Sequence, residues 1–222
     1  MSEHARKRIF ERLRSVPHPV QDAPPQAGGQ PPSAAPPSRG EMTERLKRLM
    51  EAMRAEVHVA PAAGWTEALK RLLRGRGHTT LVYGPESTLG RAVEAAWRED
   101  AEGLPELVAY TAPVEDFKQR LFTANAGITS AAGAVAETGA ILLAPDAAEP
   151  RLISLVPPVH IAVLHARDIV FSLADAMRIG RWADDMPANM LLISGPSKTA
   201  DIELTLAFGV HGPKEVIVMV LE

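Results

Sequence analysis

Short apolar runs alternate with amphipathic segments along the chain from residue 41 to its end. We interpret the amphipathic segments as helices, at residues 41–55, 64–74, 87–98, 113–121, 168–183 and 199–207. The apolar runs are typical of strands, at residues 57–59, 78–83, 106–110, 128–132, 134–137, 140–144, 152–156, 160–165, 190–194 and 215–221. Such alternation favours a parallel sheet with helices on both faces. The sequence therefore predicts an α/β fold with a three-layer, mainly parallel sheet flanked by helices, and a locally antiparallel excursion between residues 128 and 144.

The first 40 residues differ in composition from the rest of the chain. Residues 1–14 predict a short basic helix with Ile9, Phe10 and Leu13 on one side. Residues 15–40 hold eight of the 19 prolines and predict a flexible linker, because proline removes backbone donors and little apolar surface is available for burial. Residues 41–222 form the predicted α/β domain. We interpret the basic helix as a docking element rather than a nucleic-acid arm, since it carries no interleaved aromatic residues.

Composition excludes several classes of function. The chain has no cysteine, which excludes disulfides, thiolate nucleophiles and cysteine-ligated iron–sulfur clusters on this chain. The net charge of −3 argues against nucleic acid as a partner. The chain opens on charged residues and has no apolar run of the roughly 18 residues that a membrane span needs, so we expect a cytoplasmic protein. The seven histidines show no metal-ligand spacing, and no metal site is predicted.

One candidate ligand-binding segment follows the predicted strand at residues 190–194. The predicted helix start offers unpaired N–H groups and a positive dipole end, which suit phosphate or carboxylate. Plain helix capping explains the same residue types, and the two interpretations remain open. The P-loop pattern is absent. The candidate residues are Gly195, Ser197, Lys198, Thr199, Asp201 and Glu203.

A second candidate segment, residues 127–140, is dominated by small residues that allow close backbone approach. Glu137 and Thr138 stand out as polar groups between apolar strands, followed by Gly139. A carboxylate in this position can act as a general base or a nucleophile. The alternative is a tight hairpin in which Thr138 and Gly139 only form the turn, and the segment alone favours this alternative.

The third candidate is His211, which lies in a predicted loop between Gly209 and Gly212-Pro213. A histidine can transfer protons near neutral pH, so His211 is a candidate catalytic residue beside Glu137. A solvated loop histidine is the more frequent role for such a residue.

Together and in this order, these segments resemble the signature of the LUD-domain family, and in particular its lactate utilization protein C branch. The resemblance covers roughly residues 41–222, and the basic helix at the start is also similar to that of the branch. The matching segments are residues 127–139, from Gly127-Ile128-Thr129 through Ala136-Glu137-Thr138-Gly139, then Gly195-Pro196-Ser197-Lys198-Thr199-Ala200-Asp201-Ile202-Glu203 and Gly209-Val210-His211-Gly212-Pro213.

The resemblance implies a fold similar to the sugar-phosphate isomerase, CoA-transferase and formyltetrahydrofolate cyclo-ligase superfold. Members of that superfold bind phosphate-bearing or carboxylate ligands at the carboxyl edge of the sheet. The resemblance also implies a part in the bacterial oxidation of L-lactate to pyruvate, together with two cysteine-rich partner proteins that carry iron–sulfur clusters.

Two functional hypotheses follow. In the first, the chain is a non-redox subunit or accessory factor of the lactate-oxidising system and carries no cofactor itself. It would bind a small anionic ligand or a partner near Glu137, Lys198 and His211. In the second, the chain is an independent enzyme of the isomerase, acyl-transferase and cyclo-ligase superfold, acting on a phosphorylated or CoA-linked substrate with Glu137 as nucleophile or base.

Overall fold

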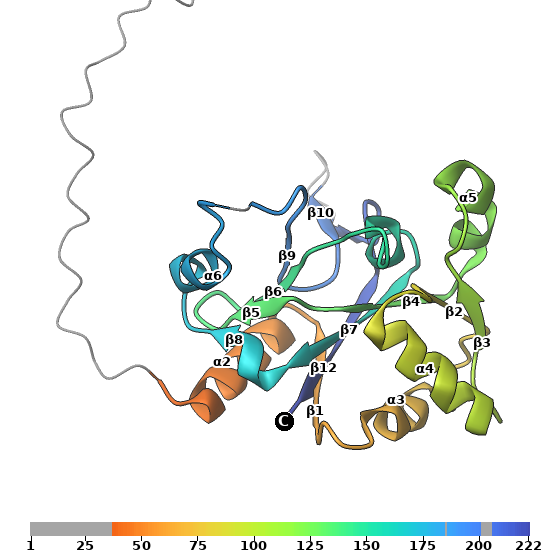
Figure 1. Ribbon diagram of the computed structural model, residues 1–222, viewed down its shortest axis with the longest axis horizontal. Helices are drawn as coiled ribbons and strands as arrows, with labels where there is room; N and C mark the ends of the chain where they lie inside the picture. The colour runs from red at the N-terminus through yellow and green to blue at the C-terminus, as the bar shows by residue number, and fades with distance from the viewer. Residues whose placement is uncertain (1–36, 185, 201–205) are drawn as a thin grey trace, which may run out of the picture. The chain divides into compact units, whose positions relative to one another are not determined.

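The computed structural model describes residues 37–184, 186–200 and 206–222. A sheet of six parallel strands lies at its centre, in the order β1-β12-β7-β4-β2-β3 (Figure 1). This arrangement confirms the predicted α/β fold with a parallel sheet. The strands are β1 (Glu56–Ala60), β2 (Thr80–Tyr83), β3 (Glu106–Ala109), β4 (Ala126–Ser130), β7 (Val159–His165) and β12 (Glu215–Leu221).

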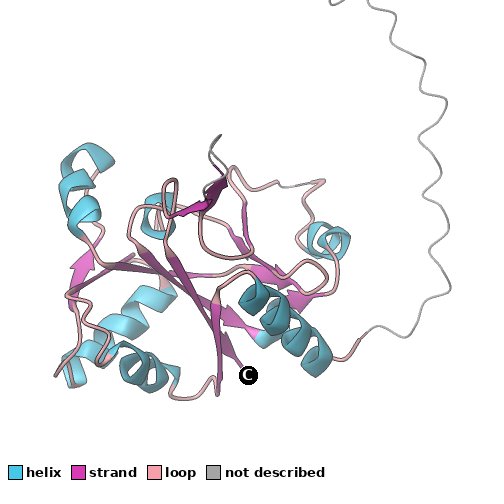
Figure 2. Cartoon of the chain, turned by 180° about the vertical axis from the view of Figure 1, so that it is seen from behind, coloured by secondary structure: helices cyan, strands magenta, loops and turns pink. Residues whose placement is uncertain are grey.

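Both faces of this sheet are buried, because successive residues of β12 pack alternately on one face and on the other. Val216, Val218 and Val220 pack on one face with Leu46 and Met50 of α2 (Arg39–Ala52). Ile217, Met219 and Leu221 of β12 pack on the opposite face with α3 (Trp65–Leu73) and α4 (Thr88–Glu99). Helix α5 (Val114–Thr123) packs against β2 through a smaller cluster. Figure 2 shows the helices on either side of the strands. These contacts account for the near-continuous apolar runs of the central strands.

A second sheet of four strands packs against the α2 face, in the order β8-β5-β6-β9. Its hairpin of β5 and β6 is antiparallel, which confirms the predicted antiparallel excursion, and β9 pairs antiparallel with β6. Helix α6 (Leu173–Ile179) covers part of this sheet through Ala176. The strands are β5 (Gly133–Val135), β6 (Ala140–Leu143), β8 (Ile169–Val170) and β9 (Leu191–Ile193).

Helix α2 begins two residues earlier than the sequence predicts. Ser38 caps it, accepting from the N–H of Glu41, while the Glu41 side chain accepts from the N–H of Ser38. These contacts form a capping box, which satisfies donors that the first turn leaves unpaired and also lowers the pKa of Glu41. The end of the predicted linker, Arg39 and Gly40, therefore belongs to the domain. The predicted N-terminal helix and the linker up to residue 36 lie outside the described residues and stay predictions.

Three predicted elements are wrong in whole or in part. The strand predicted at 152–156 is a 3-10 turn, η1 (Arg151–Ser154), in which Ser154 Oγ donates to Arg151 O. The helix predicted at 168–183 starts only at Leu173, because the chain first forms β8 and Ser172 then caps α6.

The third correction concerns the helix predicted at 199–207. Residues on either side of the undescribed segment form an antiparallel strand pair, β10 (Lys198–Ala200) and β11 (Leu206–Phe208). Just outside the pair, Gly209 N–H donates to Ser197 O at 2.9 Å. Ser197, Lys198 and Thr199 therefore do not form the helix start on which the predicted anion site depended.

None of the helices in the described part of the chain combines the length and apolar character that a membrane span requires.

Candidate functional site

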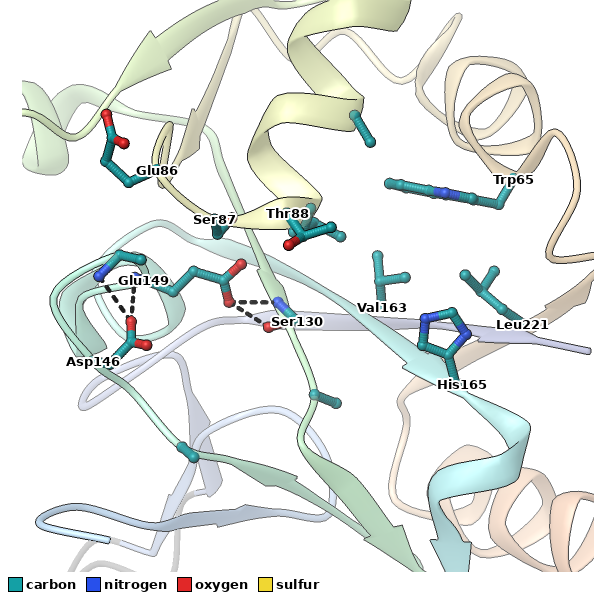
Figure 3. A pocket seen from close by; sticks show the side chains of 15 residues that line it. Trp65, Glu86, Ser87, Thr88, Ser130, Asp146, Glu149, Val163, His165 and Leu221 are labelled. Carbon is teal, nitrogen blue, oxygen red and sulfur yellow. Dashed lines mark hydrogen bonds between the residues drawn. The ribbon is translucent and has the colours of Figure 1, made fainter.

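A cavity of about 470 Å³ lies at the carboxyl edge of the six-stranded sheet (Figure 3). Ser130 ends β4, His165 ends β7 and Leu221 ends β12, and all three line it. The turn after β2 and the start of α4 close another side. Open parallel sheets commonly bind ligands at this edge, where the ends of several strands meet. The full lining is Trp65, Glu86, Ser87, Thr88, Leu89, Ala92, Ser130, Ala131, Ala144, Asp146, Ala148, Glu149, Val163, His165 and Leu221.

The first turn of α4 contributes Thr88 and Leu89 to this lining, next to the N-cap residue Ser87. The Ser87 hydroxyl accepts from Gly90 N–H at 2.9 Å and donates to Gly84 O at 3.0 Å. A helix leaves its first N–H groups without intrahelical acceptors. The Gly90 N–H is already paired with the Ser87 hydroxyl. We therefore expect the N–H groups of Thr88 and Leu89 to be the ones that a ligand could bind.

Glu149 is the most enclosed charged group of the lining, with 9% of its surface exposed. Its Oε2 atom accepts from both the N–H and the hydroxyl of Ser130, at 2.7 and 2.6 Å (Figure 3). Its Oε1 atom is buried and has no hydrogen-bond partner among the described residues. Burying an acceptor without a partner costs free energy, so the hydrogen bonds that Ser130 makes to Oε2 are what hold this carboxylate in place.

The loop that carries Glu149 is held rigidly. Asp146 Oδ1 accepts from the N–H groups of Ala148 and Glu149, both at 2.8 Å. The loop also lies directly against the end of β2: a Cβ added to Gly84 would be 1.9 Å from Ala148 O. Glycine is thus required at position 84 for the loop to reach Ser130, and Glu149 is oriented before any ligand arrives.

Apolar side chains form another part of the cavity wall, among them Trp65, Val163 and Leu221. Figure 3 shows Trp65 and His165 on this side, away from Glu149. His165 and Leu221 also line a second cavity of about 360 Å³, which carries Arg39 and Arg167. The two cavities therefore adjoin, with acidic groups (Glu86, Asp146 and Glu149) in the first and groups of both signs (Arg39, Arg167 and Glu222) in the second.

Thr138 and Glu137, which the sequence singles out, lie elsewhere. They are exposed and form the turn between β5 and β6, where Glu137 N–H donates to Phe171 O. Gly139 has a positive φ of 67° and packs on α2, so that an added Cβ would be 2.5 Å from Leu49 Cβ. None of the three lines the cavity. The catalytic role of Glu137 stays a prediction.

The structure brings the other two signature segments together. Ser197 N–H donates to Pro213 O, and a Cβ added to Gly212 would be 3.2 Å from Ser197 Cβ. Gly195 packs against the C-cap residue of α2: a Cβ added to it would be 2.7 Å from Met53 O. Lys198 is exposed and Thr199 is half-buried, both in β10. His211 follows in the adjoining loop and is exposed. Asp201 and Glu203 lie outside the described residues, so the ligand-binding roles of this group stay predictions.

Several cavity residues were missed by the sequence analysis. Ser130 belongs to the matching family segment but was not singled out within it. Ser87 follows Gly84-Pro85 and caps a helix after a buried strand, which is the arrangement that the sequence analysis assigned to Ser197. Nothing in the sequence marks Glu149, because its contact with Ser130 forms across 19 residues of chain.

His160 is fully buried in β7 but does not line the cavity, since its side chain lies on the opposite face from Ile161 and Val163. Its Nε2 atom is 2.9 Å from Thr129 Oγ1. Burial lowers the pKa of His160 to about 4, so the ring is neutral at physiological pH. Within the described residues, no group of three His, Asp or Glu side chains is placed to hold a metal ion.

Comparison with known proteins supports one family. An uncharacterized protein of Neisseria meningitidis is 33% identical over 189 residues, which cover 83% of this chain and 80% of that protein. Lactate utilization protein C 1 of Bacillus mycoides is 37% identical over 94 residues, 40% of each chain. Lactate utilization protein C of Macrococcus caseolyticus is 38% identical over 104 residues, 45% of each chain. The match to these two proteins thus spans less than half of their length.

A crystal structure of a DUF162 family protein from Deinococcus radiodurans has the same fold. It superposes with a TM-score of 0.60 at 22% identity, covering 84% of this chain and all of that one. The model of the LUD domain matches residues 43–221, which include all six strands of the parallel sheet and the whole cavity lining. The chain therefore belongs to the LUD domain family.

Proposed function

We propose that this chain is a non-redox subunit of an L-lactate utilization system, and that it binds a small anionic ligand in the cavity at the carboxyl edge of the sheet. The similarity to lactate utilization proteins C carries the choice of pathway. Oxidation of lactate releases two electrons, which a redox subunit with a cysteine-ligated iron–sulfur cluster would accept. The chain has no cysteine to ligate such a cluster, which supports a non-redox role. Cysteine-rich iron–sulfur proteins are the proposed partners.

The first turn of α4 supports the choice of ligand charge. Unpaired N–H groups and the helix dipole favour an anion there by up to about 1 kcal/mol at exposed sites and more in enclosed ones. Glu86, Asp146 and Glu149 make the neighbouring wall acidic, so among the described residues of the lining we expect an anionic group to lie at this turn or on the His165 side.

Disruption of the gene tests this function. We expect the disrupted strain to lose growth on L-lactate and to keep growth on pyruvate, since the proposed step lies between these two compounds. A tagged wild-type copy should restore growth and should co-purify with iron-containing proteins. Undiminished growth on L-lactate after disruption, with no other copy of the gene present, would contradict the proposal.

A further inference from the structure

Strand β9 forms one edge of the four-stranded sheet, where β6 is its partner (Figure 1). The register shows which way its backbone groups point. Leu142 O of β6 accepts from Ala132 N–H on the side of β5, so the N–H and C=O of Leu142 point away from β9. Leu192 lies opposite Leu142, and at such a position of an antiparallel pair both residues direct these groups outward. The N–H and C=O of Leu192 therefore face the outer side of β9, where no described residue hydrogen-bonds to them.

The side chains of this edge are unprotected as well. Residues 190–194 contain neither a charged residue nor proline, and Leu192 is 49% exposed, whereas every residue of β5 and β6 is buried. Soluble proteins usually protect an edge strand with charged side chains, proline or a covering element. At β1, an edge of the six-stranded sheet, Lys47 Nζ donates to Val57 O at 2.9 Å. Nothing comparable in the described part of the chain covers β9, so a further strand can add at this edge.

We propose that this strand is β9 of a second copy of the chain, paired antiparallel about a twofold axis at Leu192. The two Leu192 residues then exchange N–H···O bonds, and the two four-stranded sheets join into one of eight strands. The twofold sets Leu192 opposite its own copy and Leu191 opposite Ile193, so apolar side chains meet and no like charges are opposed. A strand from another protein would need the same uncharged apolar pattern, which the second copy has by symmetry.

The extent of this contact sets its strength. Exposed apolar side chains lie near both ends of β9: Met186 precedes it along the chain, and Val210 follows Gly209, whose N–H donates to Ser197 O. A stable interface buries about 1,600 Å² in total, more than a pair of three-residue strands provides, so we expect a reversible dimer. No residue between 190 and 194 lines the cavity at the carboxyl edge, so the inference goes beyond the proposed function and does not rest on it.

Sedimentation velocity of the full chain at increasing concentration tests the pairing, and wild type should shift from monomer toward dimer. Leu192→Glu and Leu192→Lys should each stay monomeric, because the twofold sets two like charges against each other. An equimolar mixture of these two variants should recover the dimer, since the mixed pair sets opposite charges face to face. Phe122→Glu, an exposed substitution on α5, should dimerise as wild type does.

A wild-type chain that is monomeric at every concentration would overturn the inference, and so would a dimer that Leu192→Glu leaves intact. Loss of the dimer in both variants without recovery in their mixture would overturn the twofold axis at Leu192. If wild type is monomeric and Leu192→Glu stops its co-purification with iron-containing proteins, the edge binds a different partner and the inference is wrong. Circular dichroism and a thermal melt establish that each variant is folded. The proposed function is tested by growth on L-lactate and can hold whichever result is found.

Discussion

Individual buried polar residues divide into two kinds in this protein. His160 contacts Thr129 through one ring nitrogen and leaves the other, Nδ1, buried without a partner among the described residues; it is enclosed by the sheet core and lines no cavity. Glu149 lines the cavity; its Oε2 is satisfied by Ser130, and its Oε1 is buried without a hydrogen-bond partner among the described residues. The sequence alone does not separate these cases. Histidine and glutamate are usually exposed or half-exposed, and what distinguishes these two is a contact partner supplied by another part of the chain.

The low pKa of His160 makes a prediction about stability. Its pKa is about 4 in the folded protein, below the ordinary value of 6.5, so the unfolded chain binds the proton first as the pH falls. The free energy of unfolding should therefore be fully retained above pH 6.5 and should fall by about 3 kcal/mol between pH 6.5 and 4 through this group.

Urea unfolding across this pH range measures the effect. His160→Gln can still hydrogen-bond to Thr129 but does not titrate, so its stability should change less between pH 6.5 and 4 than that of wild type. Equal slopes in the two proteins would show that His160 does not titrate on unfolding.

The central strands, with their apolar runs, could be predicted from the sequence. The short strands β10 and β11, which pair with each other outside the central sheet, could not. The six central strands match the predicted runs because both faces of the sheet are buried. Residues 199–207 were predicted as a helix, whereas the ends of this range belong to the paired strands β10 and β11 and residues 201–205 lie outside the described residues. The helix-start site was thereby assigned to Ser197, when the actual strand-to-helix turn is the one at Ser87 that opens α4.

Close packing at that turn predicts the effect of adding one methyl group. A Cβ on Gly90 would be 1.9 Å from Gly84 O and 3.0 Å from Tyr83 Cδ2. Helix propensity favours alanine by about 1 kcal/mol, but the clash with backbone should outweigh it. Gly90→Ala should therefore lower the free energy of unfolding by about 1–3 kcal/mol.

Gly40 in α2 is the matched control, because nothing lies within 4 Å of the position where its Cβ would be. Gly40→Ala should raise the free energy of unfolding by up to about 1 kcal/mol. Denaturant unfolding of both variants measures these changes in the free energy of unfolding. A Gly90→Ala protein at least as stable as wild type would contradict the prediction, since the backbone at Gly84 would then move aside without loss of stability.

At the scale of the whole molecule, the family signature and the cavity occupy different places. Gly139 and Gly195 allow the second sheet to pack closely on α2, at Leu49 and Met53, so part of the signature serves packing. The cavity draws on strand ends and turns that come together only in the folded chain, and of the signature segments it uses Ser130 and Ala131. The family and the fold could therefore be predicted from the sequence, whereas the position of the candidate site required the structure.

The most direct test of this position is growth on L-lactate of the disrupted strain carrying single variants at equal protein levels. Our account predicts that Glu149→Ala fails to restore growth, because Ser130 and the loop that carries Glu149, which both line the cavity, lose the carboxylate that joins them, and that Glu137→Ala restores it. Full growth with Glu149→Ala together with none in Glu137→Ala would contradict the account and place the functional site at the turn between β5 and β6.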